Sequence, residues 1–290
     1  MNKKKLIQDQ NFGFYRAIEM PDADDLLQSY KAEYYESFKD TDRRFEESED
    51  QRTEREWQES TYHRDIIDIL CSLKAGERVL DVGAGLGELV SSLSNAGYQA
   101  LGIEPSQLAV EFAREKGLQV IEGDIASFAL QEGQHGTWDA VLLLKVLEHI
   151  PNPGEVLEAI KKLLKPDGLI VVQVPNDFSD IQKAASEAIN AEPWWIAVPH
   201  HLHYFNFESL SAFLEATGFK IEQHYSDFPM ELFLLMGDDY VGNSLHGPHL
   251  HAKRRQFEMA IPNTLRQKLY SAFADVGIGR NATVFARVIK

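Results

Sequence analysis

The middle of the chain alternates between short apolar runs and longer stretches whose apolar residues recur every three or four positions. The apolar runs predict strands at 78–82, 99–104, 118–123, 138–145 and 168–174. The stretches between them predict helices at 87–97, 106–117 and 152–168, the last stopped by the Pro-Asp-Gly at 166–168. Near-continuous apolar strands that alternate with helices are typical of a parallel sheet covered on both faces. We therefore expect an α/β fold.

The pattern changes on both sides of this region. Residues 1–60 are polar and acidic but rich in aromatic residues, which predicts an N-terminal extension of amphipathic helices rather than disorder. A helix is expected at 60–73. After 174 the alternation breaks, and an irregular segment at 175–205 precedes a helix at 206–219 and a strand at 219–227. We therefore divide the chain into an N-terminal extension at 1–60, a core at 61–236, an insertion at 237–276 and a closing strand of the core within 277–290. The insertion is expected to be irregular or helical and to act as a lid or as part of the acceptor pocket.

Composition excludes several classes of protein. The formal net charge of −16 argues against a chain that grips nucleic acid through its overall field, and the basic cluster at 251–257 fits a solvated helix face. The sequence contains no apolar run of membrane-spanning length, and no apolar segment follows the lysines near the start. Cys71 is the single cysteine, so no intrachain disulfide is possible. We expect a cytoplasmic protein without nucleic-acid or membrane-spanning roles.

A glycine-rich turn follows the first strand of the alternating region. The segment VLDVGAGLGELV places glycines at 83, 85 and 87, where open α/β sheets bind their ligands. The dinucleotide fingerprint needs another glycine where this chain has Glu88, and a carboxylate there would repel a pyrophosphate. Asp81 adds a second negative charge beside the turn. The pattern therefore disfavours a nicotinamide or flavin dinucleotide and favours a cationic cofactor.

Residues 78–175 carry further motifs in order: GIEPS after the second strand, EGDI after the third, WDAVLLLKVLEHIPNP around the fourth and LLKPDGLIVVQVPN around the fifth. This series resembles the class I S-adenosylmethionine-dependent methyltransferases. The resemblance implies a doubly wound, mostly parallel seven-stranded sheet with S-adenosyl-L-methionine as cofactor. It implies that Glu104 binds the ribose hydroxyls. The cofactor-binding residues carried over are Asp81, Gly83, Ala84, Gly85, Glu104, Pro105, Asp124, Ile125, Lys145, Val146 and Leu147.

Some of these residues have two interpretations. The resemblance places Asp124 at the adenine amine and Ile125 against the ring, yet Asp124 follows a glycine and could be a turn residue. Asp81 either contacts the ligand or fixes the glycine turn through backbone N–H groups. Glu148 and His149 either cap the helical region after the fourth strand or line the site.

Histidines and aromatic residues gather in WWIAVPHHLHYF, at 194–205. His201 matches a histidine of one large bacterial subgroup of these methyltransferases better than His200 or His203 does. It is our candidate catalytic residue, as the base that accepts a hydroxyl proton or as a group that orients the acceptor. We expect Trp194, Trp195, Tyr204 and Phe205 to shield the acceptor from water. The alternative is that His201 is hydrogen-bonded to the backbone of a packed loop and has no role in catalysis.

The acceptor is expected to be a small molecule. Segments near both ends of the chain resemble the corresponding segments of methyltransferases from bacterial polysaccharide gene clusters. This resemblance implies that the acceptor is a hydroxyl of a sugar or sugar nucleotide. The alternatives are a quinone-like or other aromatic acceptor and a non-catalytic adenosylmethionine-binding protein. We expect no metal, because the histidines at 246, 249 and 251 lie in a segment that looks like a loop and no acidic or histidine set is recognisable near the fourth strand.

Overall fold

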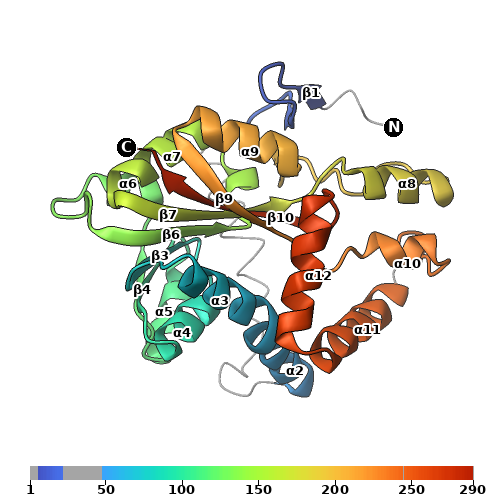
Figure 1. Cartoon of the computed structure of the whole chain (residues 1–290), viewed down its shortest axis with the longest axis horizontal. Coiled ribbons are helices and arrows are strands. Elements are labelled where there is room, and N and C mark those ends of the chain that lie inside the picture. Colours follow the sequence, from blue (N-terminus) through green and yellow to red (C-terminus); the bar gives the residue numbers. More distant parts are fainter. Residues whose placement is uncertain (1–5, 22–47, 244, 290) are drawn as a thin grey trace. The chain divides into compact units, whose positions relative to one another are not determined.

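The computed structural model describes residues 6–21, 48–243 and 245–289 (Figure 1). Seven strands form one sheet in the order β5-β4-β3-β6-β7-β10-β9, in which β3 pairs in parallel with β4 and β6, β4 pairs in parallel with β5, and β10 is antiparallel to β9. This confirms the expected mostly parallel, doubly wound sheet. The strands are β3 (Arg78–Val82), β4 (Gln99–Glu104), β5 (Val120–Glu122), β6 (Trp138–Leu144), β7 (Leu164–Pro175), β9 (Phe219–Tyr225) and β10 (Asn281–Val288).

The chain divides into two compact units. Unit 1 comprises Met1–Met20, Leu144–Pro153 and Val171–Ile289, and unit 2 comprises most of the remainder, Pro21–Leu143 and Gly154–Ile170. Strands β6 and β7 each run from one unit into the other, so the boundary follows the sheet rather than a linker.

Unit 2 contains the first strands of the alternating region and the helices between them. Val79 and Leu80 of β3 are completely buried, as are Val90 and Leu93 on the apolar face of helix α4. Figure 1 shows α4 and α5 beside β4. The helical elements of this unit are α2 (Glu49–Gln58), η3 (Glu59–His63), α3 (Arg64–Ser72), α4 (Glu88–Asn95), α5 (Gln107–Glu115), α6 (Ile125–Ala129) and nearly all of α7 (Pro153–Leu163).

Helix α7 ends earlier than its sequence suggests. We expected it to reach 168, but it stops at Leu163 and β7 begins at Leu164. The residue before a proline avoids the helical conformation, so Lys165 ahead of Pro166 cannot continue the helix. Asp167 then takes a left-handed backbone, with φ of +69°.

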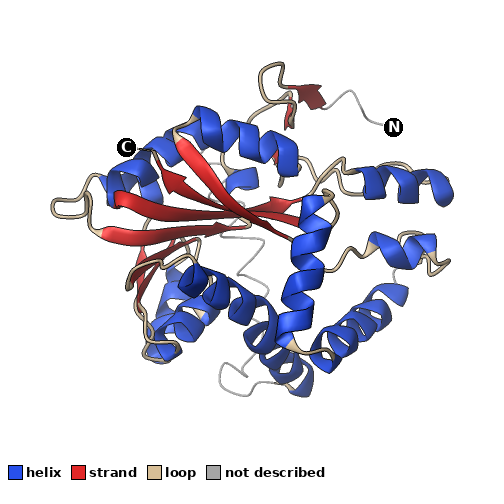
Figure 2. Cartoon of the chain, in the orientation of Figure 1, coloured by secondary structure: helices blue, strands red, loops and turns tan. Residues whose placement is uncertain are grey.

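Unit 1 contains the end of β7, the antiparallel pair β9–β10 and the remaining helices. Helix α9 (Phe207–Ala216) lies along β9 and β10 (Figure 1), and Asn206 caps it as expected, its Oδ1 accepting the N–H of Ser209 at 2.9 Å. The other helices, blue in Figure 2, are α8 (Asp180–Ala188), α10 (Glu231–Leu235), α11 (His246–Ala260) and α12 (Asn263–Asp275). We expected a loop around 246–251, but α11 accommodates Pro248 because a proline is tolerated in the first turn of a helix.

The N-terminal region is partly extended. We expected helices throughout 1–60, and α2 confirms this for its own residues. However, β1 (Leu6–Gln8) and β2 (Tyr15–Ala17) form an antiparallel hairpin that continues through β8 (His203–Tyr204) as a three-stranded sheet. Most of the aromatic segment on which the helical prediction rested, 22–47, lies outside the described residues. Among the described helices, none combines the length and the apolar character that a bilayer span requires.

Candidate active site

The glycine turn of unit 2 connects β3 to α4 through three residues with left-handed backbones. Gly83, Gly85 and Gly87 have φ of +73°, +55° and +79°, which a side chain would strain. The N–H groups of Gly83 and Ala84 both donate to the carbonyl of Ile103, at 2.8 and 3.0 Å. These bonds hold the turn against the end of β4.

A fourth glycine, which the sequence analysis did not single out, makes this approach possible. A Cβ atom placed on Gly102 of β4 would lie 2.6 Å from the Cβ of Ala84. The turn can therefore lie on β4 only because this strand position has no side chain.

Glu104, expected to bind the ribose, also anchors the turn. Its side chain is fully buried, and its two oxygens accept the N–H of Gly85 at 2.9 Å and the N–H of Ser106 at 2.8 Å. Asp81 was our candidate for holding the glycine turn, but the hydrogen bond comes from Glu104. Glu104 thus links the strand that follows the turn to the turn itself, which places a carboxylate at the carboxyl ends of β3 and β4.

Asp81 lies beside this carboxylate and is itself buried, with 4% of its surface exposed. Burial, and then the negative charge of Glu104, raise the pKa of Asp81 to about 7. Two neighbouring buried carboxyl groups favour a cation, because a positive charge would stabilise both ionised forms. The electrostatics of the turn therefore agree with a cationic cofactor.

Asp124 and Ile125 begin helix α6. Asp124 caps this helix, since its Oδ1 accepts the N–H of Ser127 at 2.9 Å and its Oδ2 accepts the Ser127 hydroxyl at 2.8 Å. The turn interpretation of Asp124 is thus observed, while its adenine contact stays a prediction. The Asp124 side chain is exposed, Ile125 is buried and Pro105 is half-buried.

Residues Lys145 to Leu147 follow β6 and belong to unit 1. Lys145 has a left-handed backbone, with φ of +61°, and its N–H donates to the carbonyl of Gln173 at 2.8 Å. Its side chain reaches solvent, yet the protein atoms around it lower the pKa of the ammonium group. Val146 is half-buried, whereas the side chain of Leu147 is completely buried in the core. A cofactor contact by Leu147 would therefore involve its backbone.

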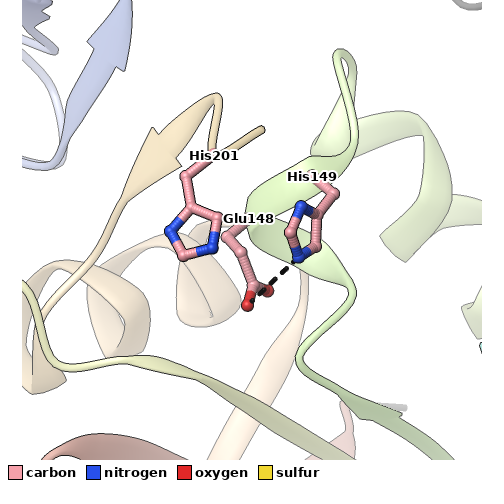
Figure 3. A group of neighbouring side chains, drawn as sticks. All are labelled: Glu148, His149 and His201. Atoms are coloured by element: carbon pink, nitrogen blue, oxygen red, sulfur yellow. Dashed lines mark ion pairs between the residues drawn. The ribbon is translucent and has the colours of Figure 1, made fainter. Parts of the chain in front are cut away.

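Glu148 and His149, in the short helix η4 (Leu147–His149), come together with His201 (Figure 3). The rings of His149 and His201 meet edge to face with centroids 4.9 Å apart, and Nε2 of His149 lies 3.7 Å from Oε1 of Glu148. Burial raises the pKa of Glu148 to about 8 and lowers the pKa of His201 to about 4. The two imidazoles are therefore neutral at physiological pH, and each has a nitrogen lone pair.

We expected His201 to lie directly after the fifth strand, but it does not. Helix α8 and an irregular segment separate it from β7, and it precedes β8. A backbone bond from the N–H of Leu202 to the carbonyl of Glu148, 2.8 Å long, brings it to η4. His200 is exposed and His203 is buried, with burial lowering the pKa of His203 to about 4.

Of the four aromatic residues expected to shield the acceptor, only two are accessible at the surface. Tyr204 and Phe205 are buried, with 1% and 0% of their surfaces exposed, so they belong to the core rather than to an acceptor surface. Trp194 and Trp195 are half-buried and meet edge to face with centroids 5.0 Å apart. Phe178 lies edge to face with Trp195 at 5.5 Å and with Tyr204 at 6.3 Å, and it connects the indoles to the histidine segment.

The strand order, the glycine turn after β3 and the buried acid that ends β4 agree with the class I methyltransferase fold that the motifs imply. A family model described as a methyltransferase domain matches residues 52–224. Because this match covers more than half of the chain, the protein belongs to that family.

Curated relatives share parts of the sequence. A ubiquinone biosynthesis O-methyltransferase of Methylococcus capsulatus is 40% identical over 106 residues, which are 35% of this chain and 45% of the relative. A ubiquinone biosynthesis O-methyltransferase of Burkholderia orbicola is 33% identical over 155 residues, which are 51% of this chain and 66% of the relative. The chain thus spans less than two thirds of the length of these relatives.

Solved structures share the fold over most of the chain. The magnesium protoporphyrin IX methyltransferase of Synechocystis, solved with bound S-adenosylhomocysteine, has a TM-score of 0.54 at 14% identity and covers 92% of this chain and 100% of its own. The 1,6-didemethyltoxoflavin-N1-methyltransferase of Burkholderia thailandensis has a TM-score of 0.52 at 16% identity, with 98% of both chains covered. At these identities the likeness shows the fold alone.

Proposed function

We propose that the protein transfers the methyl group of S-adenosylmethionine to a hydroxyl oxygen of an aromatic, quinone-like small molecule. The observation that carries this proposal is the sequence similarity to ubiquinone biosynthesis O-methyltransferases. The half-buried pair Trp194 and Trp195 supports it, because indole faces suit a flat ring. The expected sugar or sugar-nucleotide acceptor has no such support among the relatives. The expectations of cytoplasmic location and of no nucleic-acid partner remain predictions.

Within unit 2, the residues proposed to hold the cofactor lie in the glycine turn and at the ends of the strands. Glu104 would accept hydrogen bonds from the ribose while it keeps the turn in place. Asp81 would become fully ionised beside the positive sulfonium. The complete proposed set remains Asp81, Gly83, Ala84, Gly85, Glu104, Pro105, Asp124, Ile125, Lys145, Val146 and Leu147.

Methyl transfer requires the protein to align the acceptor with the methyl group and to promote removal of the hydroxyl proton. The sulfonium is already an activated leaving group, so the methyl group passes to the acceptor oxygen once the two are aligned and water is excluded. The hydroxyl proton must also leave. We propose that His201 promotes this step, because its neutral imidazole keeps a lone pair at physiological pH.

We further propose that the insertion 237–276 forms part of the acceptor pocket. Its helix α11 is attached to the segment after β9 by a buried ion pair between Arg254 and Asp227, 3.3 Å long. Arg254 also pairs with Glu258 at 3.3 Å. Attachment through buried charges favours a fixed wall over a lid that opens freely.

The test is a panel of acceptors incubated with S-adenosylmethionine that carries a labelled methyl group. We expect label on aromatic hydroxyls and none on sugar nucleotides. His201→Ala should lower turnover by at least about 100-fold while the affinity for adenosylmethionine changes little. His135→Ala is the matched control, because His135 is exposed in the segment before β6 and lies outside the proposed site. Labelled sugars, or a His201→Ala variant as fast as wild type, would overturn the proposal.

A further inference from the structure

Glu148, His149 and His201 form a compact group of metal-ligating side chains within unit 1. We call this group the Glu-His-His cluster. One ligand atom from each side chain lies within 4.8 Å of the others, and no second group of three or more such side chains occurs among the described residues. Figure 3 shows the carboxylate of Glu148 between the two imidazole rings. Because the residues come from two segments that are distant in sequence, the fold itself creates the group.

The hydrogen bonds of His149 determine which nitrogen faces the cluster. Its Nδ1 lies 2.7 Å from the carbonyl oxygen of His200, which can only accept, so Nδ1 carries the proton. At neutral pH the lone pair therefore belongs to Nε2, which faces Oε1 of Glu148 at 3.7 Å. A backbone carbonyl that fixes the tautomer of a histidine in this way is the usual support of a metal-binding imidazole.

One oxygen of the buried Glu148 carboxyl group lacks a hydrogen-bond partner. Only 1% of the surface of Glu148 is exposed, and the oxygen without a partner is Oε2. Lys145 is near enough for its charge to act on Glu148, but the two do not form an ion pair. A buried carboxyl group that has one oxygen without a partner and the other facing a nitrogen lone pair at 3.7 Å is costly unless a positive charge lies nearby.

We propose that the Glu-His-His cluster binds one divalent transition-metal ion. Two imidazole nitrogens and one carboxylate oxygen suit ions such as Zn²⁺, Mn²⁺ or Co²⁺ better than Mg²⁺ or Ca²⁺, which prefer oxygen ligands. With bonds of about 2.1 Å, ligands in a tetrahedral site lie roughly 3.4 Å apart. The Glu148–His149 separation is already near that value, and side-chain rotation can bring His201 in. Three protein ligands leave a position open for an oxygen of the acceptor.

This inference rests on the proposed function and gives His201 a definite role. An acceptor hydroxyl bound to the ion loses its proton to water more readily, because the cation stabilises the oxyanion. The oxyanion then forms a bond to the methyl carbon as the carbon–sulfur bond breaks, which yields the methyl ether, S-adenosylhomocysteine and one released proton. His201 acts as a ligand in this scheme and not as a base. The expectation of no metal rested on the absence of a recognisable acidic or histidine set near the fourth strand, and this proposal is the alternative to it.

The experiment measures metal binding to the full-length protein. The protein is stripped with a chelator, and Zn²⁺, Mn²⁺ and Mg²⁺ are then titrated by calorimetry, while Co²⁺ is followed by its visible absorption. We expect one equivalent of Zn²⁺ or Mn²⁺ per chain, weaker Mg²⁺ binding and a Co²⁺ spectrum typical of nitrogen ligands. Glu148→Gln and His201→Ala should each weaken binding by at least ~10-fold. His135→Ala should bind the ion as wild type does.

Two readouts separate this proposal from the proposed function. Adenosylmethionine affinity and circular dichroism show whether each variant is folded, and the Co²⁺ spectrum of wild type serves if a variant does not fold. Stoichiometric binding that His201→Ala loses supports the cluster even if no acceptor is methylated. Wild-type protein that binds no ion, or that binds it as tightly as His201→Ala, refutes the cluster. Undiminished methyl transfer by metal-free protein would refute the catalytic role of the ion and leave the proposed function intact.

Discussion

Replacing Glu104 tests the link between the glycine turn and the cofactor. The fully buried carboxylate accepts the N–H groups of Gly85 and Ser106 at 2.9 and 2.8 Å. Glu104→Ala leaves both donors without this acceptor, which should cost about 1–3 kcal/mol each and therefore about 2–6 kcal/mol of unfolding free energy. Glu104→Gln keeps one acceptor oxygen and should lose about half as much. Loss of the charged contact to the ribose should also weaken adenosylmethionine binding by about 1.5–3 kcal/mol, or roughly 10- to 150-fold.

Two assays measure these effects separately. Urea unfolding of the ligand-free protein gives the cost of releasing the turn, and calorimetry with adenosylmethionine gives the loss of affinity. Glu122→Gln is the matched control, because Glu122 ends the neighbouring strand β5, opposite Glu104 in the register, with its side chain exposed. If Glu104→Ala were as stable as the control and bound the cofactor equally well, the reasoning about the turn would be refuted.

Three further predictions concern packing, buried charge and pH. Gly102→Ala should lower cofactor affinity about tenfold or more, since the new methyl group meets Ala84 at 2.6 Å; calorimetry against Gly247→Ala, where a methyl group meets nothing, checks this. Arg254→Met should cost about 3–5 kcal/mol in urea unfolding, because it removes the positive charge that faces the two buried carboxylates of Asp227 and Glu258. His63 is buried against the hydroxyl of Ser92 and its pKa is lowered to about 4, so the folded state binds fewer protons than the unfolded state between pH 6.5 and 4. Stability should therefore fall as the pH drops through that window, and His63→Gln should reduce the slope by up to about 1.4 kcal/mol per pH unit; an unchanged slope contradicts this.

Local patterns predict much of unit 2. The expected strands 78–82 and 99–104 coincide with β3 and β4, because buried parallel strands are marked by apolar runs that end at charged residues or glycine. Helix ends are less accurate, as α7 shows, since the effect of Pro166 reaches back to the residues before it.

The rest depends on contacts between distant segments. The hairpin β1–β2 and the strand β8 pair with each other, and no periodicity of so few residues marks them. The hydrogen bond between Gly85 and Glu104 and the proximity of Glu148 to His201 are also tertiary contacts. The sequence analysis could therefore name these residues but could not predict which of them contact one another. The cofactor could be predicted without these contacts, because the prediction used the order of the motifs along residues 78–175.

Native mass spectrometry of the purified protein tests the central claim most directly. The intact chain is titrated with adenosylmethionine, S-adenosylhomocysteine and NAD, alongside the Glu104→Ala variant. The account predicts one bound adenosylmethionine or S-adenosylhomocysteine per chain, weakened by Glu104→Ala, and no specific NAD complex. A stoichiometric NAD complex without any adenosylmethionine complex would contradict it.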